Sequence, residues 1–425
     1  MLILAEACNP QWTSVPLEGW SHYAALARIS DAHLVTQVRN ADAIRATGLI
    51  EGRDFTAIDT ENVAGRIDRL GDRLRGGKGR GWTTKMALML FRQGHFEKQV
   101  WKQFGERIAS KQFDLVHQLT PLSPTIPPKI ATWCKRAGVP FVWGPINGGL
   151  PWPNGYTQAV MQEREWLSYL RGLYRFAPGY RSSRRDAAAI LIGSRATWDQ
   201  MPARYRDKCF YVSENAIDPT RFTRRRERRA EVPIRCAFVG RLVPYKGGLM
   251  LLEAASDLLR AGKLTIDFVG DGPQEQDLRG FVSTHQLAGV TFHGKVPHER
   301  VQDVLASADL LTFPSIREFG GAVAAEAMAV GVVPVVPAYG GLGEIVTDDT
   351  GFRLPIGPPQ QLIRDLRTLL SGLVEHPAAI DARSEPARRR ANELFTWDAK
   401  ARTVEQVWNW LLKRSEKPSL PPPSV

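Results

Sequence analysis

The chain has 425 residues, of which 43% are hydrophobic and 24% are charged, and its formal net charge is +12. This composition is that of a globular protein with room for two or three domains. The positive charge favours anionic partners such as phosphates, nucleotides, acidic lipids or nucleic acid.

Cysteine usage and hydropathy exclude further classes. The four cysteines are scattered without a CxxC pair, which argues against a disulfide framework or a zinc site and favours a reducing compartment. The sequence has no run of about 20 apolar residues that could span a membrane. The start, MLILAEACNPQW, becomes polar too early for a signal peptide, so we expect a cytoplasmic protein.

Short apolar runs alternate with longer helical patterns along the chain, which predicts a parallel α/β architecture. The candidate strands of the first half are LILAEA, AHLVTQV, FDLVHQL, PFVWGP and AAILIGS. Those of the second half are IRCAFVG, LTIDFVG, GVTFHG, ADLLTFPS and VVPVVPA. We predict two domains, residues 1–212 (joined by a helix at 396–414) and residues 213–395, with a ligand cleft between them. A proline-rich, disordered tail is predicted at 415–425.

Two cations follow the first strand of the second half, in FVGRLVPYKGG. Arg241 and Lys246 lie in a short loop between that strand and a helix, where ligands of open α/β sheets bind. They could neutralise a diphosphate, or they could be ordinary surface charges. The next strand ends in FVGDGPQ, where Gly270 belongs either to a plain tight turn or to backbone close to a ligand. Neither loop matches a P-loop or a GxGxxG fingerprint, so an ATPase or a nicotinamide enzyme is disfavoured.

The stretch REFGGAVAAEAMAVGVVPVV raises the question of a carboxylate inside an apolar segment. Glu326 is surrounded by Ala, Val and Met, eight positions after Glu318, and burying an unpaired charge costs several kcal/mol or more. A helix is predicted to begin after the glycines of FGG, and its free amides can receive an anion. A ligand with phosphates there could offer hydroxyls to both carboxylates. The alternative is that Glu318 favours the helix dipole and Glu326 faces water.

These motifs resemble the donor-binding half of retaining family 4 glycosyltransferases of the GT-B fold, in which two Rossmann-like domains face a central cleft. The pieces that carry the resemblance are RLVPYKG, GDGP, SIREFGGAVAAEAMAVGVVPVV and GGLGEIVTDDTGF, and the two glutamates match the family's E-x7-E pair. The resemblance runs from about ILIGS to the end of the chain and weakly through the first half. It also implies that the C-terminal helix crosses back to the first domain.

The resemblance implies a role for each matching position. Arg241 and Lys246 would bind the donor diphosphate, Glu318 would hold the hydroxyls of the transferred sugar, and Glu326 would accept hydrogen bonds from the ribose. Further donor contacts are expected from Phe319, Gly320, Gly321, Gly270, Lys295 and Val296. Arginine, lysine and the helix dipole would replace a divalent ion, so neither a metal nor a cofactor is expected.

The first half should hold the acceptor, although its motifs are less typical. Gly19 in PLEGW stands where the family has a two-glycine loop, and His117 in DLVHQLTP either lines the cleft or ends a strand. Asn147 lies in WGPINGGLPWP, whose composition suits a sugar-lining loop or a structural turn.

Two basic, aromatic segments lie between the strands of the first half, and they favour docking on an anionic membrane. Nucleic-acid binding, which is disfavoured because no RNA or DNA motif accompanies them, and solvated helix faces are the alternatives. The residues concerned are Arg73, Arg75, Lys78, Arg80, Trp82, Trp166 and Tyr169.

The sequence therefore predicts a retaining, metal-independent hexosyltransferase that moves a sugar from a nucleotide sugar to a glycan or lipid-linked saccharide. Such an enzyme would serve cell-surface polysaccharide or glycolipid synthesis at the inner face of a membrane. The rival interpretations are a nucleotide-sugar epimerase or phosphorylase on the same fold, and a non-catalytic sugar-nucleotide or nucleic-acid binding protein.

Overall fold

The computed structural model describes residues 1–61, 82–157, 161, 174–226 and 229–423, and it describes their side chains except those of 82–88. The basic positions Arg73, Arg75, Lys78 and Arg80, the aromatic residues Trp166 and Tyr169, and the side chain of Trp82 lie outside this description. Membrane docking by these residues therefore stays a prediction.

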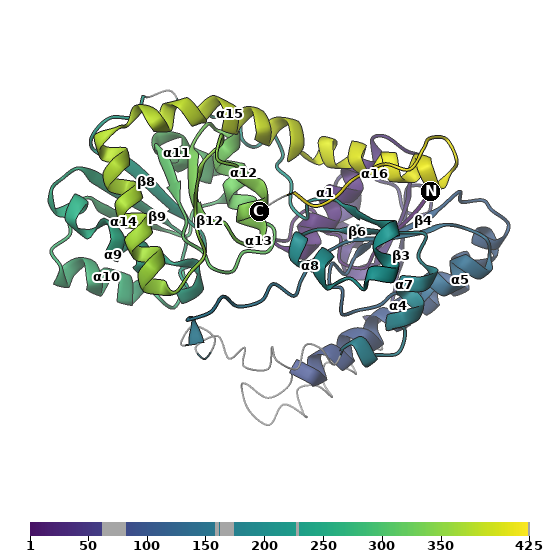
Figure 1. Cartoon of the computed structure of the whole chain (residues 1–425). Coiled ribbons are helices and arrows are strands. Elements are labelled where there is room, and N and C mark those ends of the chain that lie inside the picture. Colours follow the sequence, from purple (N-terminus) through teal and green to yellow (C-terminus); the bar gives the residue numbers. More distant parts are fainter. Residues whose placement is uncertain (62–81, 158–160, 162–173, 227–228, 424–425) are drawn as a thin grey trace. The chain divides into compact units, whose positions relative to one another are not determined.

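The chain divides into two compact units, each built on a parallel sheet (Figure 1). The first unit comprises Met1–Gly149, Arg164–Glu214 and Lys400–Pro422, and the second comprises Leu150–Glu163, Asn215–Ala399 and Pro423–Val425. The prediction of two parallel α/β domains is confirmed. One segment, Leu150–Glu163, falls in the second unit, although the sequence pattern places it in the first.

The first unit has a seven-stranded sheet of order β3-β2-β1-β4-β5-β6-β7. Its strands are β1 Leu2–Ala5, β2 His33–Gln37, β3 Phe55–Ile58, β4 Val116–Thr120, β5 Phe141–Ile146, β6 Ala189–Ile192 and β7 Cys209–Tyr211. Its helices are α1 Val15–Ala27, η1 Val38–Asn40, α2 Ala41–Arg45, α4 Trp82–Ala109, α5 Ile130–Arg136, α7 Tyr180–Asp186, α8 Arg195–Gln200 and η3 Ala203–Lys208. The last helix, α16 Trp397–Leu411, belongs to this unit from Lys400 onward.

The second unit has a six-stranded sheet of order β10-β9-β8-β11-β12-β13. Its strands are β8 Ile234–Val239, β9 Leu264–Val269, β10 Val290–Gly294, β11 Leu310–Thr312, β12 Val333–Pro337 and β13 Phe352–Leu354. Its helices are η4 Pro244–Lys246, α9 Gly248–Arg260, α10 Glu275–Thr284, α11 His298–Ser307, α12 Ala322–Ala329, α13 Gly340–Ile345, α14 Pro359–Glu375 and α15 Ala378–Leu394.

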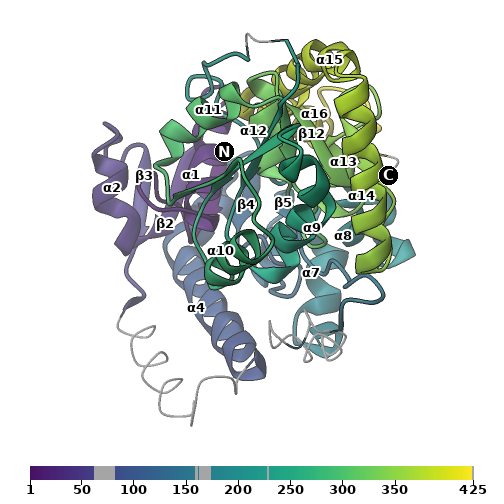
Figure 2. The same ribbon diagram turned by 90° about the vertical axis from the view of Figure 1, so that its left-hand side faces the viewer.

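Helices cover both faces of the second sheet, which explains why its strands read as continuous apolar runs. Helices α9, α10 and α14 pack together on one face, while α11, α12 and α15 pack on the other (Figures 1 and 2). The strands β11 and β12 are fully buried. Phe238 of β8 contacts Phe268 of β9 and Phe313, which follows β11, with ring centroids 5.1 Å apart in each pair. This aromatic layer lies directly beneath the loops that follow β8 and β11.

Both sheets reverse their strand order next to the first strand, between β1 and β4 and between β8 and β11. In open parallel sheets, ligands bind outside the carboxyl ends of the strands at this reversal. Each unit therefore has one expected ligand position. In the second unit it is flanked by Gly240 to Lys246 on one side and Phe313 to Gly321 on the other.

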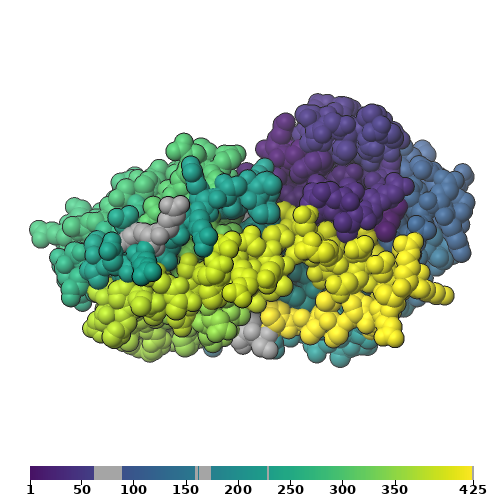
Figure 3. All heavy atoms as spheres, turned by 90° about the horizontal axis from the view of Figure 1, so that it is seen from above, coloured from purple at the N-terminus to yellow at the C-terminus, as the bar shows by residue number. Residues whose placement is uncertain are grey.

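The chain end differs from the disordered tail that its prolines predict. The amide of Tyr211 donates to the carbonyl of Leu420 at 2.8 Å, and the Lys417 ammonium lies 5.4 Å from the ring centroid of Trp410. Lys400–Pro422 thus belong to the first unit (yellow in Figure 3). The hydrogen bond from Tyr211 of β7 to Leu420 holds this proline-rich segment, and composition alone does not predict such a contact.

Candidate donor-binding site

The centre of the candidate site in the second unit is an ion pair between Lys246 and Glu318. Lys246 ends the short helix η4 after β8, and Glu318 lies in the loop after the neighbouring strand β11. The lysine Nζ donates to Oε2 of Glu318, and the two side chains are only 15% and 19% exposed. The ammonium also lies 5.2 Å from the ring centroid of Phe313. Two residues that the sequence predicted as catalytic are therefore brought together.

Glycines let the loops around this pair approach one another. Gly247 has φ +85°, and a Cβ on it would lie 2.5 Å from the carbonyl of Pro314. A Cβ on Gly341, at the start of α13, would lie 2.3 Å from the carbonyl of Phe319, and the Gly341 amide donates to the Glu318 carbonyl at 2.9 Å. The GGLGE motif thus holds the backbone of the Glu318 loop in place.

The predicted helix after FGG is α12, and its position agrees with the sequence. Gly321 takes the left-handed conformation (φ +63°) that precedes the helix, and a Cβ there would lie 2.9 Å from Gly341. Gly320 and Gly321 are both buried. Phe319 is half-buried, and the Arg317 guanidinium lies 5.3 Å from its ring centroid.

Glu326 lies on α12, and its side chain is 14% exposed. Its Oε1 lies 3.0 Å from Nε2 of His298, the first residue of α11. His298 explains how the apolar segment can contain a carboxylate, because it gives the half-buried side chain of Glu326 a hydrogen-bonding partner. Sequence reasoning did not single out His298, although it lies two positions after Val296, one of the expected donor contacts.

The remaining predicted donor residues lie in the loops that follow β8, β9 and β10. Arg241 is exposed and has no ion pair within the described part of the chain, and Lys295 is exposed between β10 and α11. Val296 packs against the core of the second unit. At Gly270 (φ +131°) a Cβ would lie 2.0 Å from the carbonyl of Gly240, so this glycine is required where two strand ends meet.

The predicted acceptor residues of the first unit lie inside it. Gly19 is within α1 rather than in a loop, and a Cβ there would lie 2.2 Å from the carbonyl of Ala7. His117 is fully buried, with Nε2 2.7 Å from the carbonyl of Gly144, and burial lowers its pKa to about 4. Both residues have packing roles that explain their presence.

Asn147 belongs to a buried polar network at the end of β5. Its Nδ2 donates to Glu214, and its Oδ1 accepts from Ser194 Oγ at 2.6 Å. Glu214 also receives a hydrogen bond from Lys400 at its backbone carbonyl. Burial lowers the pKa of Lys400 and raises that of Glu18, a third member of this charged group.

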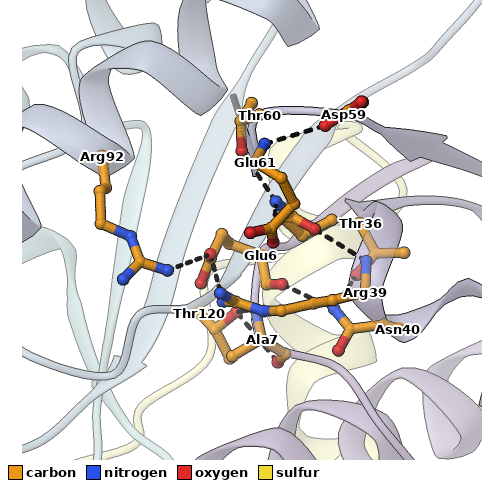
Figure 4. A network of polar contacts seen from close by, with 11 residues as sticks. Glu6, Ala7, Thr36, Arg39, Asn40, Asp59, Thr60, Glu61, Arg92 and Thr120 are labelled. Carbon is orange, nitrogen blue, oxygen red and sulfur yellow. Dashed lines mark hydrogen bonds and ion pairs between the residues drawn. The ribbon is translucent and has the colours of Figure 1, made fainter. Parts of the chain in front are cut away.

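A second polar cluster, which the sequence did not predict, lies at the strand reversal of the first unit (Figure 4). Glu6 follows β1 directly, and its Oε1 lies 2.5 Å from Arg39 of η1 and 3.9 Å from Arg92 of α4. Thr120, at the end of β4, donates to the carbonyl of Ala7 at 3.3 Å. The rule that places ligands at strand ends could have singled out Glu6, since it is the first charge after LILA.

The cluster also includes Gln37, the last residue of β2, and two residues that follow β3. The side-chain amide of Gln37 donates to Thr60 at 3.0 Å and to Glu61 at 2.8 Å. Asn40 donates to the carbonyl of Glu6 at 2.8 Å. Carboxylates, guanidinium groups and hydroxyls thus gather where a ligand is expected. Among the described residues, no group of three or more His, Cys, Asp or Glu side chains could hold a metal ion.

Two parallel-sheet α/β units are the architecture of the GT-B fold, and solved glycosyltransferase structures share it with this chain. The chain aligns with HepE of Anabaena in complex with UDP and glucose over 96% of its length and 98% of the other chain (TM-score 0.57, 15% identity). It also aligns with sucrose-phosphate synthase of Thermosynechococcus elongatus over 97% and 99% (TM-score 0.59, 16% identity).

Residues 220–385 match the family described as "Glycosyl transferases group 1", so this part of the chain is a group 1 glycosyltransferase domain. The chain is 28% identical over 198 residues to the phosphatidylinositol N-acetylglucosaminyltransferase GPI3 subunit of Saccharomyces cerevisiae, covering 45% of this chain and 42% of the relative. It is 34% identical over 172 residues to a D-inositol 3-phosphate glycosyltransferase of Rhodococcus opacus, covering 38% and 37%. The chain thus matches less than half the length of these curated relatives.

Proposed function

We propose that this protein transfers a hexose from a nucleotide sugar to a saccharide or lipid-linked saccharide, with retention of anomeric configuration. The observation that carries the proposal is the Lys246–Glu318 pair at the strand reversal of the second unit. Glu326 follows on the helix that begins beside that pair. The group 1 domain and the folds of the solved relatives support the same activity.

Each donor group has a partner in the proposed complex. The diphosphate binds Arg241 and Lys246, the transferred sugar binds Glu318, and the ribose binds Glu326. The start of α12 adds unpaired amides beside the phosphates. These fixed positive charges and dipoles stabilise the negative charge that develops on the leaving diphosphate, so we propose that neither a metal nor a cofactor is required.

The acceptor binds in the first unit, at the cluster of Glu6, Arg39 and Arg92. The cluster occupies the ligand position of that sheet, and carboxylates and guanidinium groups can pair with vicinal hydroxyls of a sugar. The cluster contains a carboxylate as well as guanidinium groups, which favours a saccharide end over a bare phosphate. The cluster replaces Gly19, His117 and Asn147 as our leading acceptor residues, because these three have packing roles.

We also propose that the protein works on the cytoplasmic side, at the surface of a membrane. A relative whose name refers to phosphatidylinositol supports a lipid-bearing acceptor. In the described part of the chain no helix is sufficiently long and apolar to span a bilayer. A salt-sensitive association with anionic vesicles, and little with neutral ones, is the expected result of a vesicle sedimentation assay; equal recovery in the supernatant with both would favour a water-soluble acceptor.

The test of the activity combines a thermal-shift screen of nucleotide sugars with a donor hydrolysis assay. A bound donor should raise the melting temperature, and slow hydrolysis without acceptor should follow for the donor that stabilises most. A protein that is stabilised but releases no sugar would be a binding protein. Conversion of the donor to an epimer would instead identify an epimerase.

A further inference from the structure

His298 is held in a fixed relation to Glu326. The two residues lie on the adjacent helices α11 and α12, and Nε2 of the histidine lies 3.0 Å from Oε1 of the glutamate. The ring of Phe222, a buried residue of the second unit, packs against the imidazole edge-on with centroids 5.7 Å apart. The imidazole is therefore placed between a buried aromatic ring and a carboxylate.

The pair differs from an ordinary surface ion pair in its exposure. The Glu326 side chain is 14% exposed and the His298 side chain is 49% exposed. The carboxylate is thus largely withdrawn from water, while its partner remains accessible to protons. Each carboxylate oxygen has two acceptor positions, so the histidine occupies one of them and leaves Oε2 for other donors.

We propose that His298 is a positioning residue that orients Glu326 toward the ribose hydroxyls, so that nucleotide affinity depends on protonation of this imidazole. The inference rests on the proposed function, since it concerns the carboxylate that we assign to the ribose. An alternative is that His298 only offsets the cost of withdrawing Glu326 from water. The alternative predicts an effect of His298 on folding stability but none on the pH dependence of binding.

The charges around His298 give the sign of the effect. The hydrogen bond that His298 donates to Glu326 raises the pKa of His298; Glu299 also raises it, whereas partial burial and Arg221 lower it. The imidazole of His298 therefore stays charged to a higher pH than the imidazole of a free histidine, whose pKa is about 6.5. A charge-assisted hydrogen bond is about twice as strong as a neutral one. Loss of the proton as pH rises should loosen Glu326 and weaken nucleotide binding.

The experiment compares the wild type with His298→Ala and His298→Gln. UDP, GDP and ADP are screened by thermal shift, and the dissociation constant of the best binder is measured by calorimetry from pH 6.0 to 8.5. We expect the wild type to bind about fivefold more tightly than His298→Ala at pH 6.0 and about twofold more tightly at pH 8.5, where the neutral imidazole can still donate. His298→Gln keeps a donor without a titrating proton, so its advantage over His298→Ala should not change with pH. Titration of the nucleotide phosphate affects all three proteins and cancels in the ratios.

Two controls separate positioning from stability. In a Glu326→Gln background, His298→Ala should have no further effect on affinity, because the residue it positions is gone. His285→Gln changes an exposed histidine directly after α10 that stacks on Phe281, and it should bind nucleotide as the wild type does at every pH.

The outcomes are distinguishable. A ratio of wild-type to His298→Ala affinity that is constant with pH, or an effect of His298→Ala that persists with Glu326→Gln, overturns the inference while leaving the proposed function intact. Failure of the wild type to bind any of the three nucleotides overturns both. Circular dichroism confirms folding of each variant, and His298→Asn replaces His298→Ala if the latter does not fold.

Discussion

Lys246 and Glu318 are 72 positions apart in the sequence, yet they form an ion pair at the meeting point of two neighbouring strand ends. Both side chains are mostly buried, although neither is part of the apolar core. In the proposed reaction the lysine faces a diphosphate and the glutamate faces a sugar. The pair would therefore hold each charge in place before the donor arrives.

Replacing Lys246 by Ala should reduce kcat about 100-fold, because removal of one preorganised group that stabilises transition-state charge costs about 10² to 10³ in rate. Lys263→Ala changes an exposed lysine and should retain full activity. Steady-state kinetics with the donor identified by thermal shift provide the measurement. Comparable rates for the two variants would remove Lys246 from the catalytic group.

The start of α13 should be intolerant of a single added methyl group. A Cβ on Gly341 would lie 2.3 Å from the Phe319 carbonyl, so Gly341→Ala should displace the Glu318 loop, cost about 1–3 kcal/mol of stability and weaken donor binding. Gly372→Ala is the matched control, since nothing lies within 4 Å of that position in α14, and it should stabilise the protein by up to about 1 kcal/mol. Denaturant unfolding and donor titration of both variants test the contrast.

Glu97 should give the first unit a pH-dependent stability. Its Oε2 accepts from the amides of Lys129 at 2.8 Å and Ile130 at 3.2 Å, and burial raises its pKa to about 7. A carboxyl whose pKa is higher in the folded than in the unfolded state binds more protons when folded, so its contribution to stability falls as pH rises between about 4.5 and 7. At about 1.36 kcal/mol per pKa unit, the loss is about 3 kcal/mol.

The Glu97→Gln variant isolates this effect. The amide remains neutral and can still accept a hydrogen bond through its oxygen, so the variant should gain stability relative to the wild type as pH rises from 5 to 8. Urea unfolding across that range measures the difference. A difference that does not change with pH would show that Glu97 does not titrate there.

Glu6→Gln should raise the acceptor KM without affecting donor hydrolysis. The change removes the negative charge that lies 2.5 Å from Arg39 and leaves the second unit untouched. Glu51→Gln alters an exposed carboxylate that pairs with Arg45 and serves as the control. If Glu6→Gln slows hydrolysis and transfer to the same extent, Glu6 acts on the donor side or on folding.

Most strands, and a site that contains both Lys246 and Glu318, could be predicted from the sequence. The strands that were missed have a common physical cause. The missed strands β3, β7 and β13 have three or four residues each and lie at sheet edges, where one neighbour is absent and a long apolar run is not required. The donor motifs were readable because they combine glycines, charges and strand ends within a few positions.

The sequence did not predict several polar contacts, and the reason differs from that for the strands. His298 meets Glu326, and Arg39 and Arg92 meet Glu6, only because separate helices and strand ends converge in three dimensions. Hydrophobic periodicity contains no information about such pairs. Gly19 and His117 are a different case, because close packing also explains the residue that a motif position suggested as a ligand contact; their part in acceptor binding stays a prediction.

The assignment of Leu150–Glu163 to the second unit limits how this protein can be recombined with its relatives. Tyr156 is buried in the core of the second unit, and the Tyr339 hydroxyl donates to the Pro151 carbonyl at 2.7 Å. A chimera that exchanged only residues 215–399 would place these contacts against a foreign surface. An exchange that preserves the second unit must also include Leu150–Glu163, which lies in the sequence between two segments of the first unit.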